Sequence, residues 1–325
     1  MKINKKISAA ILTAATAVSL SFSVQAEYVA GEDVAVLQGF KPGGGSDVLA
    51  QLVQPYISKT LGVNFVNEYI PGATGAIAWT RLAKQSKKDG SVISVTNTPM
   101  LMTNYIMNDA ITYNIKDLTP IANVVTDPGI AVVAKDSPIN TLEDLIAAAK
   151  EKPGRITVGN SGMGGDDYFT TLMVEKATGL SFKKVPFQGD GPSATAAMGN
   201  KIDVSFNNVG TVYSQVQSGN LKALAVFSEK RIDSMPDVPT LKEKGIDVVA
   251  GSSRGYSAPA GIPDEARDQL IAAFEALKTD QAFLEDAKKR ALSIDIVTGE
   301  AYGEMFQRME KEFQGIWEEV SAKQQ

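Results

Sequence analysis

The chain has 325 residues, of which 44% are hydrophobic, and this is enough for one large domain or two ordinary ones. It contains no cysteine and no histidine, which excludes disulfides, thiolate chemistry, Ser-His-Asp triads and histidine-based zinc sites. Its net charge of −5 comes without a basic stripe and argues against nucleic acid or anionic membranes as partners.

Residues 1–26 have the pattern of a secretory signal. Three lysines precede the apolar stretch Ile7 to Phe22, and Val24-Gln25-Ala26 places small residues at the −3 and −1 positions of a cleavage site. A retained membrane anchor is the alternative, but the stretch holds several Ser and Thr residues. We therefore predict a periplasmic protein cleaved after Ala26, whose mature chain has a net charge of −8 and does not insert into the membrane.

A glycine-rich stretch, Phe40-Lys41-Pro42-Gly43-Gly44-Gly45-Ser46-Asp47, joins a predicted strand (34–37) to a predicted helix that ends at Gly62. Consecutive glycines let the backbone approach a ligand, and a helix start adds free N–H groups and a partial positive charge. The stretch is either a site for an anion such as a carboxylate or an ordinary capped turn, since Ser and Asp are common N-caps.

The chain then repeats the order of strand, loop and helix. Strands are predicted over 64–69 and 92–96, with a helix from about Ala76 to Lys84 between them, and their polar turns carry Thr74 and Thr98. This alternation is typical of parallel sheets flanked by helices, in which ligands lie beyond the carboxyl ends of the strands.

A second glycine-rich turn, Ser161-Gly162-Met163-Gly164-Gly165-Asp166-Asp167, follows a predicted strand (155–160) and precedes a helix from Tyr168 to about Ala177. Its spacing fits neither a Walker phosphate loop nor a dinucleotide fingerprint. Two such turns suggest two lobes that each offer a helix N-terminus to a shared cleft, although glycine-rich turns are also ordinary in α/β proteins.

The remaining elements continue the α/β pattern. Thr141 and Asp144 resemble a capping box, and the stretch 251–256 is expected to cross between the lobes. Strands are predicted over 130–134, 182–186, 204–207, 221–227 and 293–297, and helices over 141–150, 193–198, 211–218, 264–277, 281–290 and 299–322. A stripe of Met and aromatic residues in the last helix indicates core packing rather than a cofactor site.

Seven motifs, in order and behind the signal, resemble the extracytoplasmic solute receptors of tripartite tricarboxylate transporters, the Bug family. They are Phe40–Asp47, Asn67–Gly75, Thr141–Leu145, Val158–Gly164, Val185–Gly189, Leu224–Arg231 and Met235–Leu241. The resemblance implies an α/β Venus-flytrap fold of two domains, each a mainly parallel sheet flanked by helices. We predict that domain 1 comprises 27–122 and 254–325, and domain 2 comprises 123–253.

In that family, two loops hold one ligand carboxylate through backbone amides, small hydroxyls and ordered waters. Carried over, these loops are Phe40–Asp47 and Ser161–Asp166. We expect further ligand-binding residues in the polar turns that face the same cleft. The full predicted set is Phe40, Pro42, Gly43, Gly44, Ser46, Asp47, Thr74, Thr98, Ser161, Gly162, Gly164, Gly165, Asp166, Gln188, Asn208 and Arg254. Asp47 is expected to cap its helix and order the loop, because a bare carboxylate would repel a carboxylate ligand.

The chain departs from the family pattern at three places. Gln51 replaces a usual arginine, and Asp166-Asp167-Tyr168 stands where a histidine is common. Arg254 replaces an aromatic residue of many relatives, and it either pairs with a distal carboxylate of the ligand or is a solvated hinge arginine.

The resemblance implies a monomeric receptor that captures a small organic carboxylate, closes on it and delivers it to membrane permease subunits. It implies no catalysis, cofactor or metal. The alternatives are a receptor of another uptake system, such as an ABC-type anion receptor, and a histidine-free secreted enzyme with Asp166 or Asp167 as its base.

Overall fold

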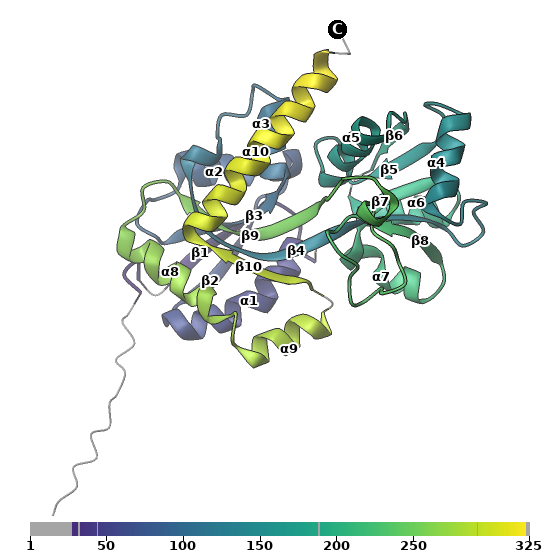
Figure 1. Cartoon of the computed structure of the whole chain (residues 1–325). Coiled ribbons are helices and arrows are strands. Elements are labelled where there is room, and N and C mark those ends of the chain that lie inside the picture. The colour runs from purple at the N-terminus through teal and green to yellow at the C-terminus, as the bar shows by residue number, and fades with distance from the viewer. Residues whose placement is uncertain (1–27, 32, 44, 188, 291, 323–325) are drawn as a thin grey trace, which may run out of the picture.

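The computed structural model of the protein describes residues 28–31, 33–43, 45–187, 189–290 and 292–322 (Figure 1). The predicted signal peptide and its cleavage site, together with Gly44 and Gln188, lie outside the described residues.

Strands and helices alternate along most of the chain. The strands are β1 (Asp33–Gln38), β2 (Asn64–Tyr69), β3 (Val92–Thr98), β4 (Leu118–Ala134), β5 (Thr157–Asn160), β6 (Lys183–Pro186), β7 (Val204–Asn208), β8 (Leu221–Val226), β9 (Gly251–Pro259) and β10 (Ile294–Thr298). The α-helices are α1 (Gly45–Leu61), α2 (Ala76–Gln85), α3 (Met100–Met107), α4 (Leu142–Glu151), α5 (Asp166–Thr178), α6 (Asp190–Met198), α7 (Val209–Gln217), α8 (Asp264–Ala276), α9 (Gln281–Lys289) and α10 (Gly299–Ala322). Short 3₁₀ turns are η1 (Ala73–Gly75), η2 (Ile115–Asp117) and η3 (Lys242–Lys244).

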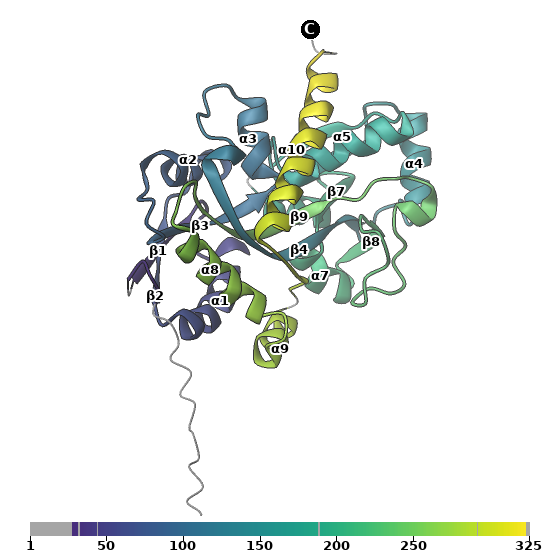
Figure 2. The same ribbon diagram turned by 60° about the vertical axis from the view of Figure 1, so that its left-hand side comes forward.

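Two lobes lie on either side of the antiparallel pair β4 and β9, which Figures 1 and 2 show running from one lobe to the other. In the first lobe, β1 pairs in parallel with β2 and β3, and β3 pairs with β9. In the second lobe, β5 pairs in parallel with β6 and β7, and the second half of β4 pairs with β7 and β8. The carboxyl ends of both parallel sets therefore face the region between the lobes.

Each lobe has its own apolar core. In the first lobe, α1 packs over β2 and β3 and α8 packs over β4 and β10, with Val36, Val53 and Phe274 fully buried. In the second lobe, Phe206 packs edge-on against Phe227, with ring centroids 5.0 Å apart.

The two-domain α/β fold that the resemblance implied is the fold observed. The predicted boundaries at 122/123 and 253/254 fall inside β4 and β9 and stay a prediction.

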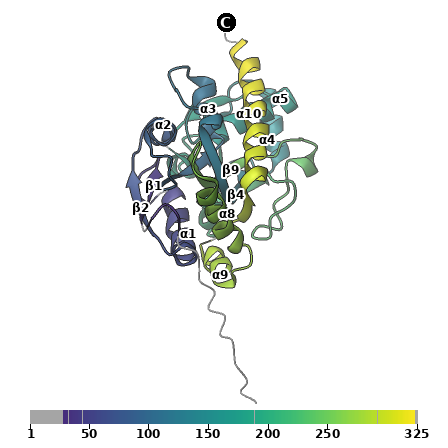
Figure 3. The ribbon, with the colours of Figure 1, turned by 90° about the vertical axis from the view of Figure 1, so that its left-hand side faces the viewer.

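Helix α10 belongs to the first lobe but also contacts the second. Phe313 of α10 packs edge-on against Phe169 of α5, with ring centroids 5.0 Å apart, and Lys176 pairs with Glu319 at 2.7 Å. Figure 3 shows α10 running beside α3 and α5 over much of the height of the molecule. The predicted Met and aromatic stripe is core, since Phe306 is buried and Met305 and Met309 pack against the same cluster.

Most predicted elements agree with the structure, and the differences have local causes. Helix α3 was not predicted, because it is apolar on most sides and follows directly after Pro99. Strand β4 begins at Leu118 rather than at Ile130; Pro120, Pro128 and the bulges in its pairing with β9 hide its length in the sequence. The predicted capping box of Thr141 and Asp144 is present.

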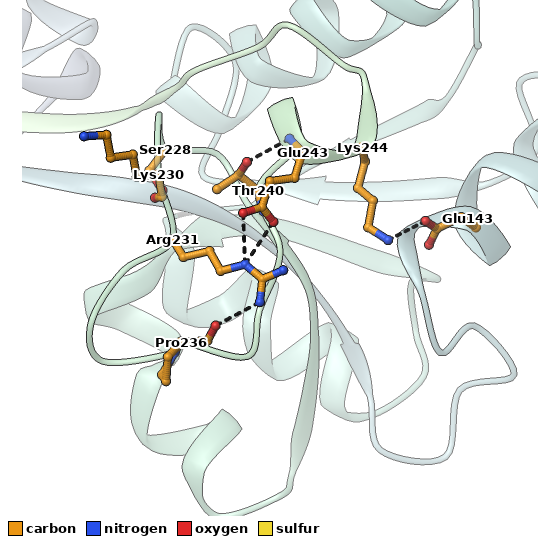
Figure 4. Close-up of polar contacts among 8 residues, drawn as sticks. All are labelled: Glu143, Ser228, Lys230, Arg231, Pro236, Thr240, Glu243 and Lys244. Carbon is orange, nitrogen blue, oxygen red and sulfur yellow. Dashed lines mark hydrogen bonds and ion pairs between the residues drawn. The ribbon is translucent and has the colours of Figure 1, made fainter.

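The loop between β8 and η3 is held by charged side chains at the surface (Figure 4). Arg231 donates from Nε to both carboxylate oxygens of Glu243, at 3.0 and 2.9 Å, and from Nη1 to the carbonyl of Pro236 at 3.0 Å. Lys244 pairs with Glu143 of α4 at 2.6 Å. The motifs Leu224–Arg231 and Met235–Leu241 thus contribute residues whose contacts order this loop.

No helix within the described ranges is both long and apolar enough to span a bilayer.

We predict that Gly255→Ala lowers the free energy of unfolding by about 3 kcal/mol. A Cβ at Gly255 would lie 2.1 Å from the carbonyl oxygen of Ala122 and 2.7 Å from the Tyr302 hydroxyl, so β9 would have to move away from β4. Urea denaturation measures the change.

Gly315→Ala in α10 is the matched control, because a Cβ there meets no atom within 4 Å and alanine favours helices. Its stability should be unchanged or higher. Equal stability of the two variants would contradict the role assigned to Gly255.

Candidate ligand-binding site

The first glycine-rich loop is ordered by a carboxylate of its own helix. Asp47 Oδ2 accepts hydrogen bonds from the Gly43 N–H at 2.7 Å and from Gln51 Nε2 at 2.9 Å, and Oδ1 accepts one from the Tyr69 hydroxyl at 2.6 Å. These hydrogen bonds, that of Tyr69 above all, lower the pKa of Asp47. Gln51 therefore helps to hold the carboxylate of Asp47.

The start of α1 presents hydrogen-bond donors next to Arg254. Within the described part of the chain, no acceptor is assigned to the N–H groups of Gly45 and Ser46, while the Ser46 hydroxyl donates to Asn97 Oδ1 at 3.0 Å. A Cβ on Gly45 would lie 3.0 Å from Nε of Arg254, so the guanidinium lies directly against this turn. Free helical N–H groups and a guanidinium together suit an anion.

Arg254 lies between the lobes and is not a solvated hinge arginine. Its side chain is 12% exposed, and Nη1 lies 3.7 Å from Oδ2 of Asp127 in β4. Asp127 Oδ1 in turn accepts a hydrogen bond from the Gly210 N–H at the start of α7, at 3.0 Å. Arg254 thus connects the first loop with the second lobe.

The second glycine-rich loop surrounds Asp166, the first residue of α5. Asn208 Nδ2 donates to Asp166 Oδ2 at 2.7 Å, and the Ser161 hydroxyl lies 3.4 Å from Oδ1. The Thr103 hydroxyl of α3 donates to the carbonyl of Gly164 at 2.6 Å, so this loop also contacts the first lobe.

Four carboxyl groups gather around the second loop: those of Asp127, Asp166 and Asp167, which are buried residues, and that of Asp190, a partly exposed residue whose Oδ1 is buried. Burial raises the pKa of all four, that of Asp190 to about 6, and the charge of Asp166 raises the pKa values of Asp167 and Asp190 further. Asp167 and Asp190 face each other, and their pKa values indicate a shared proton. The Arg254 charge partly opposes the effect of burial at Asp127 and Asp166.

The other predicted site residues occupy different places. Thr98 is buried at the end of β3 with its hydroxyl unpartnered, and the Thr74 carbonyl accepts from Asn104 Nδ2 at 3.1 Å. Phe40 packs edge-on against Trp79, and Pro42 is exposed. The structure therefore groups the predicted residues into a first set (Gly43, Ser46 and Asp47), a second set (Ser161, Gly162, Gly164, Gly165, Asp166 and Asn208) and Arg254 between them.

Asp127 and Asp190 were not predicted as site residues. Asp127 lies between Thr126 and Pro128 in a strand whose length the sequence did not reveal, and no motif marks it. Asp190 follows the Val185–Gly189 motif directly, so the motif was the available signal.

A cavity of about 380 Å³ lies beside the crossing strands, on the side of α10. Thr126, Gly251 and Ser253 line it, whereas Arg254 and Asp127 lie on the opposite face of the same strands. Of the predicted site residues that the structure describes, Asp166 alone reaches this cavity. No group of three or more acidic side chains in the described ranges has the arrangement of a metal site.

We predict that Tyr69→Phe raises the pKa of Asp47 toward its ordinary value of 3.8, because the largest stabilisation of its charged form is lost. At neutral pH the variant should be less stable by about 1 kcal/mol. The difference should vanish as the pH falls through the pKa of Asp47, since both proteins then carry a neutral carboxyl group. Carboxyl NMR titration and urea unfolding measure both effects; a pKa that does not change would contradict them.

The Asp167 and Asp190 pair gives a stability effect of the opposite sign. The folded state holds protons more tightly than the unfolded state, so the pair makes the free energy of unfolding fall as the pH rises from 3.8 to about 6. Asp167→Asn should flatten this fall in urea unfolding measured across that range, whereas Asp233→Asn, at an exposed position, should not. Parallel pH profiles for wild type and Asp167→Asn would refute the shared proton.

Comparison with known proteins identifies the family. The family model "Tripartite tricarboxylate transporter family receptor" matches residues 49–316. Protein BugT of Bordetella pertussis is 27% identical over 73% of this chain and 74% of its own. A TctC solute-binding protein from Polaromonas has a TM-score of 0.75 at 32% identity, covering 89% of this chain and 98% of its own.

An R. palustris protein solved with adipate shares the fold, with a TM-score of 0.77 at 24% identity over 90% of this chain and 96% of its own. Members of the matched family are solute-binding receptors and not enzymes, which removes the secreted enzyme from the alternatives. The chain belongs to the receptor family of the tripartite tricarboxylate transporters.

Proposed function

We propose that this protein is a periplasmic receptor that binds a small organic carboxylate between its lobes and delivers it to the membrane subunits of a tripartite tricarboxylate transporter. The observation that carries the proposal is the start of α1, where Gly45 lies against the guanidinium of Arg254 and where, among the described residues, no acceptor is assigned to the N–H groups of Gly45 and Ser46. In a chain of net charge −5, a local cluster of donors is what an anion requires.

The proposed mechanism is closure about β4 and β9. A ligand that contacts both glycine-rich loops binds the closed form more tightly than the open form, and this difference in affinity is what shifts the population. The transporter would then distinguish the closed receptor from the open one. Other proteins of this fold hold carboxylates, as the adipate-bound R. palustris structure illustrates.

The remaining elements of the proposal follow from the sequence. The chain is exported by its signal, cleaved after Ala26, and acts as a monomer with domains 27–122 plus 254–325 and 123–253. The two loops, Thr74, Thr98, Gln188, Asn208 and Arg254 supply the contacts to the ligand.

The mature protein should show a higher melting temperature in the presence of its carboxylate, because a ligand that binds only the folded state stabilises it by mass action. A panel of mono-, di- and tricarboxylates, aromatic acids included, tests this by thermal shift, with calorimetry for those that stabilise. An absence of any shift across the panel would overturn the proposal.

Ser46→Glu should abolish the shift, because it places a carboxylate where the ligand carboxylate would bind. Ser218→Glu introduces the same charge at an exposed position and should bind like wild type. Circular dichroism confirms that both variants fold; unchanged affinity of a folded Ser46→Glu would show that α1 does not bind the carboxylate.

A further inference from the structure

The cavity on the α10 side of the crossing strands is a second space between the lobes. Its volume of about 380 Å³ falls within the range of about 300–1,000 Å³ that small-molecule sites occupy. Helix α10 of the first lobe forms one wall, α5 and residues 227–229 of the second lobe form the other, and β4 and β9 form the floor. Because Arg254 lies on the opposite face of β9, this cavity is separate from the proposed carboxylate site.

The wall of this cavity is mostly apolar. Met309 and Phe313 of α10 line it from the first lobe, and Met173 of α5 and Phe227 line it from the second. Val249, which also lines it, is 39% exposed, although large apolar side chains elsewhere in the protein are mostly buried. Thioether and aromatic side chains form a surface that adapts to the apolar body of a small molecule.

The polar groups of the wall already have partners within the protein, with one exception. The side chains whose hydroxyl or carboxyl groups are engaged are Thr126, Ser253, Thr170, Ser228, Asp166 and Glu229. The exception is Glu312 of α10. Among the described residues, its carboxyl group has neither a hydrogen-bond donor nor an ion-pair partner, and Arg308, one turn earlier, forms no ion pair with it.

Glu312 gives the cavity one negative charge that the protein does not compensate. No lysine or arginine of the described chain lines the cavity. As a whole residue Glu312 is exposed, yet burial raises the pKa of its carboxyl group, which indicates that the carboxyl end lies against the cavity wall rather than in open water. A carboxylate in such a place gains most from a partner with a positive charge.

We propose that this cavity is a second binding site, which takes a small organic ammonium ion with an apolar or aromatic body. The body lies between Met173, Met309 and Phe313, and the ammonium group binds the carboxylate of Glu312. A single unpartnered carboxylate favours a monoamine, because the further charges of a polyamine would lie against apolar side chains. The site does not depend on the proposed carboxylate function.

Two pairs of probes test the proposal, each pair sharing one body and differing in charge: 2-phenylethylammonium with 2-phenylethanol, and hexylammonium with hexanol. Isothermal titration calorimetry with the mature full chain at neutral pH gives the dissociation constants. We expect the ammonium member of at least one pair to bind about fivefold tighter than its alcohol, as a half-buried ion pair provides.

Glu312→Gln removes the charge while keeping the size of the side chain, and it should bring the preference for the ammonium ion below about twofold. Glu304→Gln removes an exposed carboxylate of the same helix outside the cavity and should keep the wild-type preference. Both positions are exposed, so both variants should fold, and circular dichroism checks this.

A variant that narrows the cavity tests the place of binding without changing charge. Ala250 lines the cavity and is half-buried, so Ala250→Leu should weaken the binding of both members of a pair by a similar factor. Ala301→Leu, at an exposed position of α10 outside the cavity, is the matched control and should bind like wild type.

The outcomes decide for or against the ammonium site alone. Equal affinity for the ammonium ion and its alcohol in every pair that binds would overturn it, and so would a preference that survives intact in folded Glu312→Gln. Absence of binding of both ammonium ions up to about 10 mM would also overturn it. None of these results bears on the carboxylate receptor, which its own panel of ligands tests.

Discussion

The structure depends on the pairing of β4 with β9. These two strands connect the lobes, carry Asp127 and Arg254 into the space between them, and lie close enough that Gly251 and Gly255 leave no room for a Cβ. Both cores are built on the same β4, whose first half belongs to one sheet and whose second half belongs to the other. Any motion of the lobes must therefore be taken up by this pair, and the charged residues that it carries move with the hinge.

The order of elements could be predicted from the sequence because strand and helix periodicity alternate with glycine-rich turns along most of the chain. The two loops could also be predicted, since three glycines before Ser46 and Asp47, and a similar run before Asp166, are visible without a structure. The role of Asp47 could also be predicted from electrostatics. An unpaired carboxylate at an anion site would repel the ligand, so Asp47 was expected to form hydrogen bonds with other groups of the protein. Its three hydrogen bonds agree with that reasoning.

The gathering of the acidic side chains could not be predicted, because it arises from contacts distant in the sequence. Asp127, Asp166 and Asp190 come from three separate elements, and only the pairing of β4 with β7 and β9 brings them to one place. The same holds for Arg254: the sequence left open whether it was buried, and its position against Gly45 decides the matter. Local patterns give elements and turns, whereas the charge balance of a cleft is a property of the assembled fold.

The packing of α10 against α5 places a tryptophan whose fluorescence depends on the contact between the two lobes. The chain has two tryptophans. Trp79 is fully buried in the first lobe, whereas Trp317 is partly exposed on α10, against the cluster formed with Phe169 and Leu172 of the second lobe. A change in the angle between the lobes alters the surroundings of Trp317 and leaves those of Trp79 unchanged. The intrinsic fluorescence of the unlabelled protein therefore follows lobe movement through a single indole ring.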